Sequence, residues 1–360
     1  MRNRIFSSLA VAVVAAGSLS ACSKGDAAGA SGGGSEHHVY AFLMPCSTCA
    51  DRFENQDKPL FEAAIQKIDP GAVVIATNAQ GDSAAQISQT EAAISNGADV
   101  IVVSPLDESA GSAISAKAEA AGIPVVSYDG LLTGAPIDYY VSFDNEKVGE
   151  FQGQYLADNL KPGASVVMIN GDQTIAPGRD FKAGAHAALD PLFDSGQLKL
   201  AYESDTAQFD PAKAQASMEQ ALTKLGDQAD AVLVPNDGIA GGVINALAAR
   251  NLVGKVLVTG QDATDAGLQR IVLGQQSMTV YKALKDEAEA AAAAAFALAE
   301  GDDVSSLATG STDNGAGEVP TQLLAPVAVT LDNMASTVFA DGFTTADKVC
   351  TGEAAGKCPQ

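Results

Sequence analysis

Asp99-Val-Ile-Val-Val-Ser104 is an unbroken apolar run of strand length, and helical patterns flank it over residues 83–95 and 108–121. A half-exposed strand alternates apolar and polar residues, whereas this run is apolar at every inner position. Both faces of the strand are therefore expected to be covered, as happens when helices pack on the two sides of a parallel sheet. The run and its flanks predict an α/β fold.

The same alternation of strand and helix recurs in two series. The first predicts strands over 39–44, 72–77, 99–104, 124–128 and 139–143, and the second over 165–169, 198–202, 231–235, 255–259 and 277–281. Helices are predicted over 57–68, 83–95, 108–121, 146–159, from about 179, 211–225 and 239–250. An alanine-rich helix over 284–299 and a strand over 323–330 follow. Two such series predict two doubly wound parallel-sheet lobes.

The first 21 residues have the pattern of a secretory signal. Arg2 and Arg4 precede an apolar stretch over 5–16, and Leu19-Ser-Ala-Cys22 closes it. Because the pattern ends in cysteine, it resembles a bacterial lipobox, whose thiol is lipidated and becomes the first residue of the mature chain. An ordinary signal peptide with an incidental cysteine is the alternative. Residues 22–36, rich in Gly, Ala and Ser, predict a flexible tether, so we expect an extracytoplasmic protein anchored to the cell membrane at Cys22.

The charge of the chain excludes one class of partner. Asp and Glu number 44 against 21 Lys and Arg, a formal net charge of −23. Loss of the segment before Cys22 removes two arginines, which gives 19 − 44 = −25. So acidic a surface repels phosphate backbones, and nucleic acid is not expected as a partner.

Four cysteines beyond Cys22 form two close pairs, Cys46/Cys49 and Cys350/Cys358. In an oxidising compartment an even, paired count predicts two disulfides, the second of which would hold the C-terminus. The first pair is a C-x-x-C, for which a redox centre, or half of a metal site with His37 and His38, is the alternative. We expect a structural disulfide and no metal.

The residues that follow the predicted strands indicate binding rather than catalysis. Ligands of open parallel sheets lie beyond the carboxyl ends of the strands. No Ser/His/Asp or Cys/His arrangement and no G-x-G-x-x-G loop follows these strands, so neither an enzyme nor a nucleotide cofactor is expected. Asp, Asn, Gln, Arg and Lys stand there instead, and these side chains suit a neutral ligand with many hydroxyls.

Four motifs in order carry a family resemblance. They are Asp138-Tyr-Tyr-Val-Ser-Phe-Asp-Asn-Glu-Lys-Val-Gly-Glu150, Pro235-Asn-Asp-Gly-Ile-Ala-Gly-Gly242, Thr259-Gly-Gln-Asp-Ala263 and Met278-Thr-Val-Tyr-Lys282. Over about 39–343 the chain resembles the sugar-binding subunits of bacterial ABC importers, in the xylose-binding branch of the ribose-type (type I) periplasmic binding proteins. The resemblance implies a monomer whose two lobes, joined by three crossings, close on one monosaccharide. The closed form would then dock on a membrane permease driven by an ATPase.

The resemblance also implies lobe boundaries and site residues. We expect an N-terminal lobe of 37–143 plus 282–322 and a C-terminal lobe of 144–281 plus 323–360. The positions that match the family's sugar-binding residues are Arg52, Asp129, Asn236, Asp262 and Lys282, with Phe53 and Phe209 as the rings that stack on the sugar. Gly130 stands where the xylose-binding relatives carry a second arginine, and Ile175-Ala-Pro177 replaces an acidic, asparagine-rich run. Arg179 is expected to reach into the space that these changes vacate.

Other interpretations of these residues remain open. Asp129 and Asp262 are also suited to cap helices, Arg52 to form only a surface ion pair, and Phe209 to lie in the core. At the level of function, a hexose or polyol would suit the same pocket. A sensor that signals to a chemoreceptor or histidine kinase, or a thiol oxidoreductase built on Cys46 and Cys49, is a further alternative.

Overall fold

The computed structural model describes residues 37–50 and 52–359. The predicted signal segment, Cys22 and the tether lie outside the described residues. Within the described part of the chain, no helix has both the length and the apolar character needed to span a bilayer.

The first lobe is built on a seven-stranded sheet. Its strands, in spatial order, are β11 (Gly310–Asp313), β12 (Glu318–Leu324), β5 (Tyr139–Phe143), β4 (Val125–Tyr128), β3 (Val100–Val103), β1 (Val39–Met44) and β2 (Val73–Asn78). All neighbouring strands pair in parallel except β11, which pairs antiparallel with β12. The parallel sheet that the apolar runs predict is confirmed.

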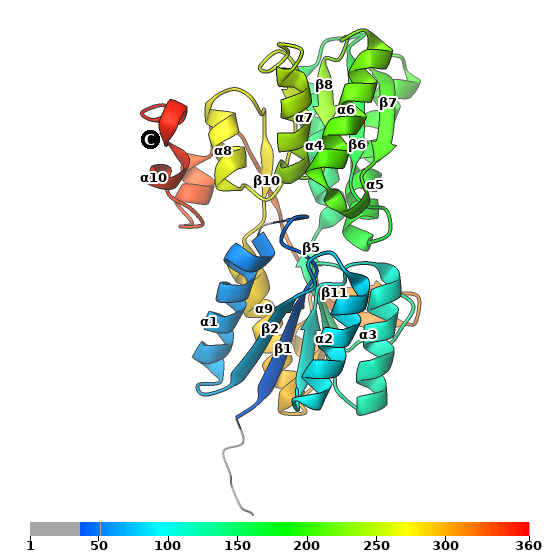
Figure 1. Ribbon diagram of the computed structural model, residues 1–360, viewed down its shortest axis with the longest axis vertical. Helices are drawn as coiled ribbons and strands as arrows, with labels where there is room; N and C mark the ends of the chain where they lie inside the picture. The colour runs from blue at the N-terminus through cyan, green and yellow to red at the C-terminus, as the bar shows by residue number, and fades with distance from the viewer. Residues whose placement is uncertain (1–36, 51, 360) are drawn as a thin grey trace, which may run out of the picture. The chain divides into compact units, whose positions relative to one another are not determined.

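Helices cover both faces of this sheet (Figure 1). They are α1 (Lys58–Ile68) and α9 (Leu284–Ala299) on one face, and α2 (Ser83–Ser95) and α3 (Glu108–Ala121) on the other. On β3, Val100 and Val102 pack with α1 and α9, whereas Ile101 and Val103 pack with α2 and α3. All four β3 side chains are buried, which is the physical reason that the strand carries no polar residue.

The second lobe has a four-stranded parallel sheet in the order β7 (Lys199–Asp205), β6 (Ser165–Asn170), β8 (Ala231–Leu233) and β9 (Leu257–Val258). Its helices are α4 (Asn145–Asn159) and α5 (Ala176–Asp194) on one face and α6 (Pro211–Leu225) and α7 (Asp237–Ala248) on the other. The fold class is thus as predicted, with two doubly wound lobes.

A smaller unit completes the second lobe. β10 (Thr279–Tyr281) and β13 (Val327–Val329) pair antiparallel, and α8 (Asp265–Val272) and α10 (Ala346–Val349) pack beside them. The Cys350–Cys358 disulfide lies in this unit, and both cysteines pack against its apolar cluster. The sequence pattern did not predict α8 or β11.

The predicted strand over 323–330 is in fact two strands in different sheets. β12 ends at Leu324 beside β5, and β13 begins at Val327 beside β10. Pro326 stands between them and has no N–H to continue a ladder. The chain also passes between the sheets after β5 and after β10, which makes three passages. The exact lobe boundaries remain a prediction.

Candidate functional site

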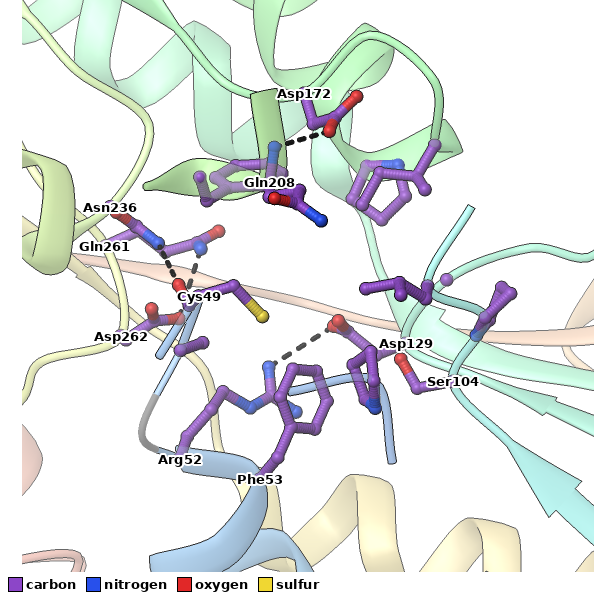
Figure 2. Close-up of a pocket in the computed structure, with 18 of the residues that line it drawn as sticks. Cys49, Arg52, Phe53, Ser104, Asp129, Asp172, Gln208, Asn236, Gln261 and Asp262 are labelled. Carbon is purple, nitrogen blue, oxygen red and sulfur yellow. Dashed lines mark hydrogen bonds and ion pairs between the residues drawn. The ribbon is translucent and has the colours of Figure 1, made fainter. Parts of the chain in front are cut away.

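A pocket of about 650 Å³ lies beyond the carboxyl ends of the strands of both lobes (Figure 2). The first lobe contributes Pro45, Cys49, Ala50, Arg52, Phe53, Ser104, Pro105, Leu106, Asp129 and Gly130. The second lobe and the passage after β10 contribute Asp172, Ile175, Pro177, Phe181, Gln208, Phe209, Asn236, Gln261, Asp262 and Lys282.

The structure brings seven of the eight proposed ligand-binding residues to this pocket. They are Arg52, Phe53, Asp129, Phe209, Asn236, Asp262 and Lys282. Residues 52 and 282 are far apart in the chain, yet both side chains contact Asp129. Their roles in binding remain a prediction, but their convergence is a property of the fold.

Arg179 is the exception and does not line the pocket. α5 begins at Ala176 rather than near Arg179, because Pro177 fits the first turn of a helix, where its missing N–H costs nothing. Arg179 therefore sits within that turn, and its Nη1 donates to the carbonyl of Gln173 at 3.1 Å. The expectation that Arg179 reaches into the vacated space is wrong for this structure; Ile175 and Pro177 line the pocket there instead.

Arg52 is held by a buried ion-pair cluster beneath the pocket. Its Nη2 donates to Asp57 Oδ1 at 2.6 Å and to Glu287 Oε2 at 2.7 Å, and its Nε donates to Asp57 Oδ2 at 2.9 Å. The two carboxylates are fully buried and Arg52 is 3% exposed, so the interpretation as a surface ion pair is wrong. The hydroxyl of Tyr128 also donates to Asp57. These contacts fix the guanidinium and leave Nη1 directed at Asp129, 3.2 Å away.

Burial disfavours the charged form of Glu287 and, opposed by the charge of Arg52, raises the pKa of Glu287 to about 8. The protonated form of Glu287 leaves the positive charges of Arg52 and Lys282 facing the carboxylates of Asp57 and Asp129. This pairing limits the cost of removing these groups from water.

Asp129 is poised to accept from a ligand. Its Oδ1 accepts from Arg52 and from Lys282 Nζ at 3.4 Å, so the second carboxylate oxygen is available to a hydroxyl. Burial favours the protonated form, but the charges of Lys282 and Arg52 outweigh it and lower the pKa of Asp129. The residue has φ +59° and no helix follows it directly, so the capping interpretation fails here. Hydroxyl groups of Tyr140 and Ser142 hold its carbonyl.

The second lobe supplies a row of amides and an acid opposite this cluster. Asn236 caps α7 through the amide of Ile239 at 2.9 Å and also lines the pocket. Gln261 donates to Asp262 Oδ1 at 3.1 Å, and burial raises the pKa of Asp262 to about 7. Thr264, not Asp262, caps the following helix. Asp262 is therefore free of a capping role.

Aromatic rings give the pocket apolar faces. Phe209 lies in the core cluster of the second lobe as well as in the pocket lining, so both interpretations of this residue hold. A Cβ on Gly171 would lie 2.3 Å from its ring, which is the reason for glycine there. Lys282 Nζ lies between the rings of Phe143 and Phe181, 5.3 and 5.2 Å from their centroids. At these distances the face of each ring attracts the ammonium electrostatically.

Apolar residues of both lobes also line the pocket. They are Pro105, Leu106, Ile175 and Pro177, and Gly130 lies against Pro105, whose Cδ would be 3.1 Å from an added Cβ. The pocket therefore combines hydrogen-bonding groups with apolar surface.

Residues that the sequence reasoning missed include Asp57, Glu287 and Gln208. Asp57 follows Arg52 by five residues, in a helical turn over Phe53–Asp57, and that spacing is the one local signal for the pair. Glu287 belongs to an alanine-rich helix 235 residues away from Arg52, and no local pattern marks it.

The family model of the periplasmic binding protein domain matches residues 40–303. The chain belongs to this family. This chain is 40% identical over 279 residues to the D-xylose-binding periplasmic protein of Haemophilus influenzae. The match covers 78% of this chain and 83% of the relative. The corresponding Escherichia coli protein is 38% identical, with 80% and 86% covered.

Solved structures agree with this assignment. A carbohydrate transporter solute-binding protein from Chloroflexus aurantiacus, solved in complex with D-glucose, matches the periplasmic binding protein with a TM-score of 0.80 and 30% identity. The match covers 87% of this chain and 98% of the other. The predictions of a type I periplasmic binding fold and of an extracytoplasmic sugar-binding receptor of an ABC transporter, not an enzyme, are confirmed.

The two cysteine pairs are bonded, Cys46 to Cys49 and Cys350 to Cys358. His38 Nδ1 donates to Asp69 Oδ2 at 2.9 Å. Over residues 37–50 and 52–359, no group of three or more His, Cys, Asp or Glu side chains is arranged to hold a metal ion.

Proposed function

We propose that this receptor binds a pentose-like, xylose-related monosaccharide in the pocket and delivers it, as a monomer, to the permease of an ABC importer by closure of the lobes. One observation carries the proposal. Charged and amide groups of both lobes, among them Arg52, Asp129, Asn236 and Asp262, line one pocket together with Phe53 and Phe209. A sugar offers apolar C–H faces for the rings and hydroxyls for the charged partners.

The apolar lining residues support a pentose over a hexose. A pentose in its pyranose form has a ring CH₂ where a hexose carries a CH₂OH group, and a hydroxyl placed against Pro105, Leu106 and Ile175 would lose its hydrogen bonds to water. The relatives named for D-xylose support the same ligand class. The D-glucose complex of a structural relative makes hexoses the alternative to be tested.

A thermal-shift screen of pentoses, hexoses and linear polyols tests the ligand class. A sugar at a hundredfold excess over its Kd stabilises the folded protein by about 2.7 kcal/mol, which corresponds to a rise in Tm of about 5–10 °C. We expect D-xylose or another aldopentose to give the largest rise. A larger rise with glucose or a polyol would overturn the choice of pentose, and no rise with any compound would overturn sugar binding in this pocket.

We propose that Cys22 carries the lipid anchor. The support is the pattern of residues 1–22, which resembles a lipobox and is followed by a Gly- and Ser-rich tether. Replacing Cys22 with alanine is expected to shift the protein from the membrane fraction of cells to the soluble fraction, because acyl chains supply the membrane affinity. Retention of the variant in the membrane fraction would contradict the proposal.

A further inference from the structure

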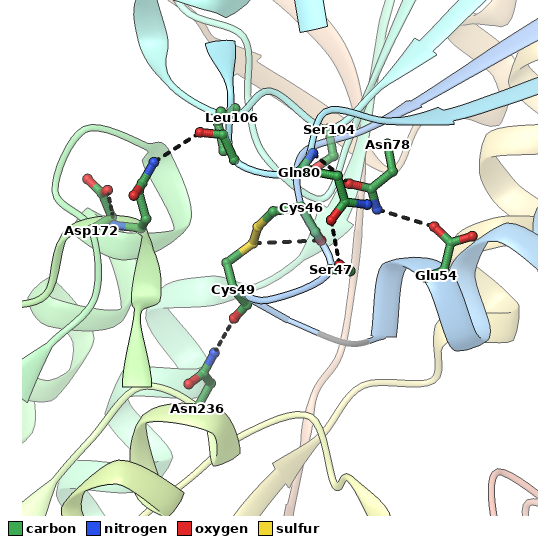
Figure 3. The surroundings of a disulfide bond; sticks show 12 residues. Cys46, Ser47, Cys49, Glu54, Asn78, Gln80, Ser104, Leu106, Asp172 and Asn236 are labelled. Carbon is green, nitrogen blue, oxygen red and sulfur yellow. Dashed lines mark hydrogen bonds between the residues drawn. A yellow bond between two sulfur atoms is a disulfide. The ribbon is translucent and has the colours of Figure 1, made fainter. Parts of the chain in front are cut away.

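The Cys46–Cys49 disulfide lies in the rim of the first lobe, between β1 and the turn that carries Arg52 and Phe53 (Figure 3). The rim consists of residues 45–50 and 79–82. Its two segments are bonded to each other: the amide of Gly81 donates to the carbonyl of Pro45 at 3.0 Å, and Ser47 Oγ donates to Gln80 Oε1 at 2.7 Å. These hydrogen bonds connect the two segments of the rim, and the disulfide cross-links the segment 45–50.

The second lobe holds this rim at two points. Asn236 Nδ2 donates to the carbonyl of Cys49 at 3.4 Å, and Gln208 Nε2 donates to the carbonyl of Gly81 at 3.2 Å. Cys49 also packs against the apolar cluster of the second lobe, which contains Phe209. Figure 2 shows the Cys49 sulfur directed toward the middle of the pocket. The second lobe thus contacts the rim through two hydrogen bonds and an apolar contact beside the pocket.

A general stabilising role explains this disulfide poorly. The bonded cysteines are three residues apart, against eight for Cys350 and Cys358. In the chain-entropy model a shorter loop removes less disorder from the unfolded chain, so Cys46–Cys49 is expected to contribute less to global stability than its counterpart. Its location between the lobes calls for a local explanation.

We propose that the Cys46–Cys49 disulfide is a positioning element for ligand binding. It holds the carbonyl groups of the rim where the side chains of Asn236 and Gln208 donate hydrogen bonds to them. The disulfide thereby slows the dissociation of the sugar. The inference rests on the proposed function, sugar binding between the lobes. With the disulfide absent, the rim samples more conformations and both cross-lobe hydrogen bonds are weakened. The affinity then falls mainly through a faster dissociation rate.

The test compares two disulfide variants of the full chain, C46S/C49S and C350S/C358S. The sugar is the compound that the thermal-shift screen selects, with Kd from calorimetry and rates from stopped-flow tyrosine fluorescence. We expect C46S/C49S to raise Kd about tenfold, the equivalent of weakening two neutral hydrogen bonds, with little change in the association rate. C350S/C358S is expected to lower Tm more and to leave Kd within twofold.

A second measurement covers the case that C46S/C49S folds poorly. In the C350S/C358S background, dithiothreitol passes two electrons and two protons to Cys46 and Cys49, which become thiols while the reagent closes to a cyclic disulfide. Reduction should raise Kd, and reoxidation should restore it. Q208A should weaken binding less when the disulfide is absent than when it is present, because both changes act on the same contacts between the rim and the second lobe.

The outcomes separate the two proposals. A wild-type protein that binds no sugar overturns the proposed function. A wild-type protein that binds, with C46S/C49S and the reduced protein binding equally tightly and releasing equally slowly, overturns the role of the disulfide alone. If Q208A lowered the affinity equally with and without the disulfide, the proposal that both act on the same contacts would also be contradicted.

Discussion

Replacing Asp129 with asparagine is expected to weaken sugar binding by about 10- to 150-fold. A hydrogen bond to a charged group contributes about 1.5–3 kcal/mol, and each 1.4 kcal/mol is tenfold in Kd. Asparagine keeps the side-chain shape and tolerates the φ of +59° at this position, so the change isolates the charge. It also deprives Arg52 and Lys282 of the carboxylate that they share. Calorimetry with the best ligand from the screen measures the loss.

Asp107 provides the matched control for this variant. It also follows a strand of the first lobe, but it caps α3 through the amide of Ala110 at 2.7 Å and does not line the pocket. D107N is expected to leave Kd within about twofold, since a cap contributes to the stability of a helix rather than to the ligand. Equal affinities of D129N and the wild type would show that Asp129 does not hold the sugar.

Replacing Arg52 with methionine is expected to lower the free energy of unfolding by about 3–5 kcal/mol, the usual cost of removing one partner of a buried ion pair. Methionine fills much of the volume of the arginine side chain, so the loss comes from charge. Asp57, fully buried, would keep Tyr128 as a donor but lose both hydrogen bonds and the charge of Arg52. Glu287 would lose its hydrogen-bond donor as well. Urea denaturation measures the change.

Lys58 and Glu54 form the matched control pair, 3.1 Å apart and partly exposed to solvent. K58M removes a cation six residues further along the chain and is expected to cost less than about 1 kcal/mol. The triple variant R52M/D57M/E287M should recover part of the stability lost in R52M, because the two fully buried carboxyl groups that Arg52 contacts are then replaced as well. A loss in R52M no larger than that in K58M would contradict the buried cluster.

Much of the fold follows from local patterns. The helices over 83–95, 108–121, 211–225 and 284–299 lie where the sequence predicts them, since apolar spacing and helix propensity belong to the segment itself. Ligands of parallel sheets lie beyond the carboxyl ends of the strands, and this rule indicated Asp129, Asn236 and Asp262 as candidate binding residues. The predicted element boundaries were wrong where a single proline changed the backbone geometry. Pro177 did so at the start of α5, and Pro326 did so between β12 and β13.

The sequence alone was enough to establish the α/β class, the two lobes, the family and the chemical character of the pocket. These properties depend on periodicity, on composition and on motifs whose residues are close in the chain. The partners of Arg52, the exclusion of Arg179 and the grip of Asn236 and Gln208 on the disulfide-linked rim required the folded molecule. They depend on contacts between segments as much as 235 residues apart, and such contacts arise only when helices and strands pack against one another.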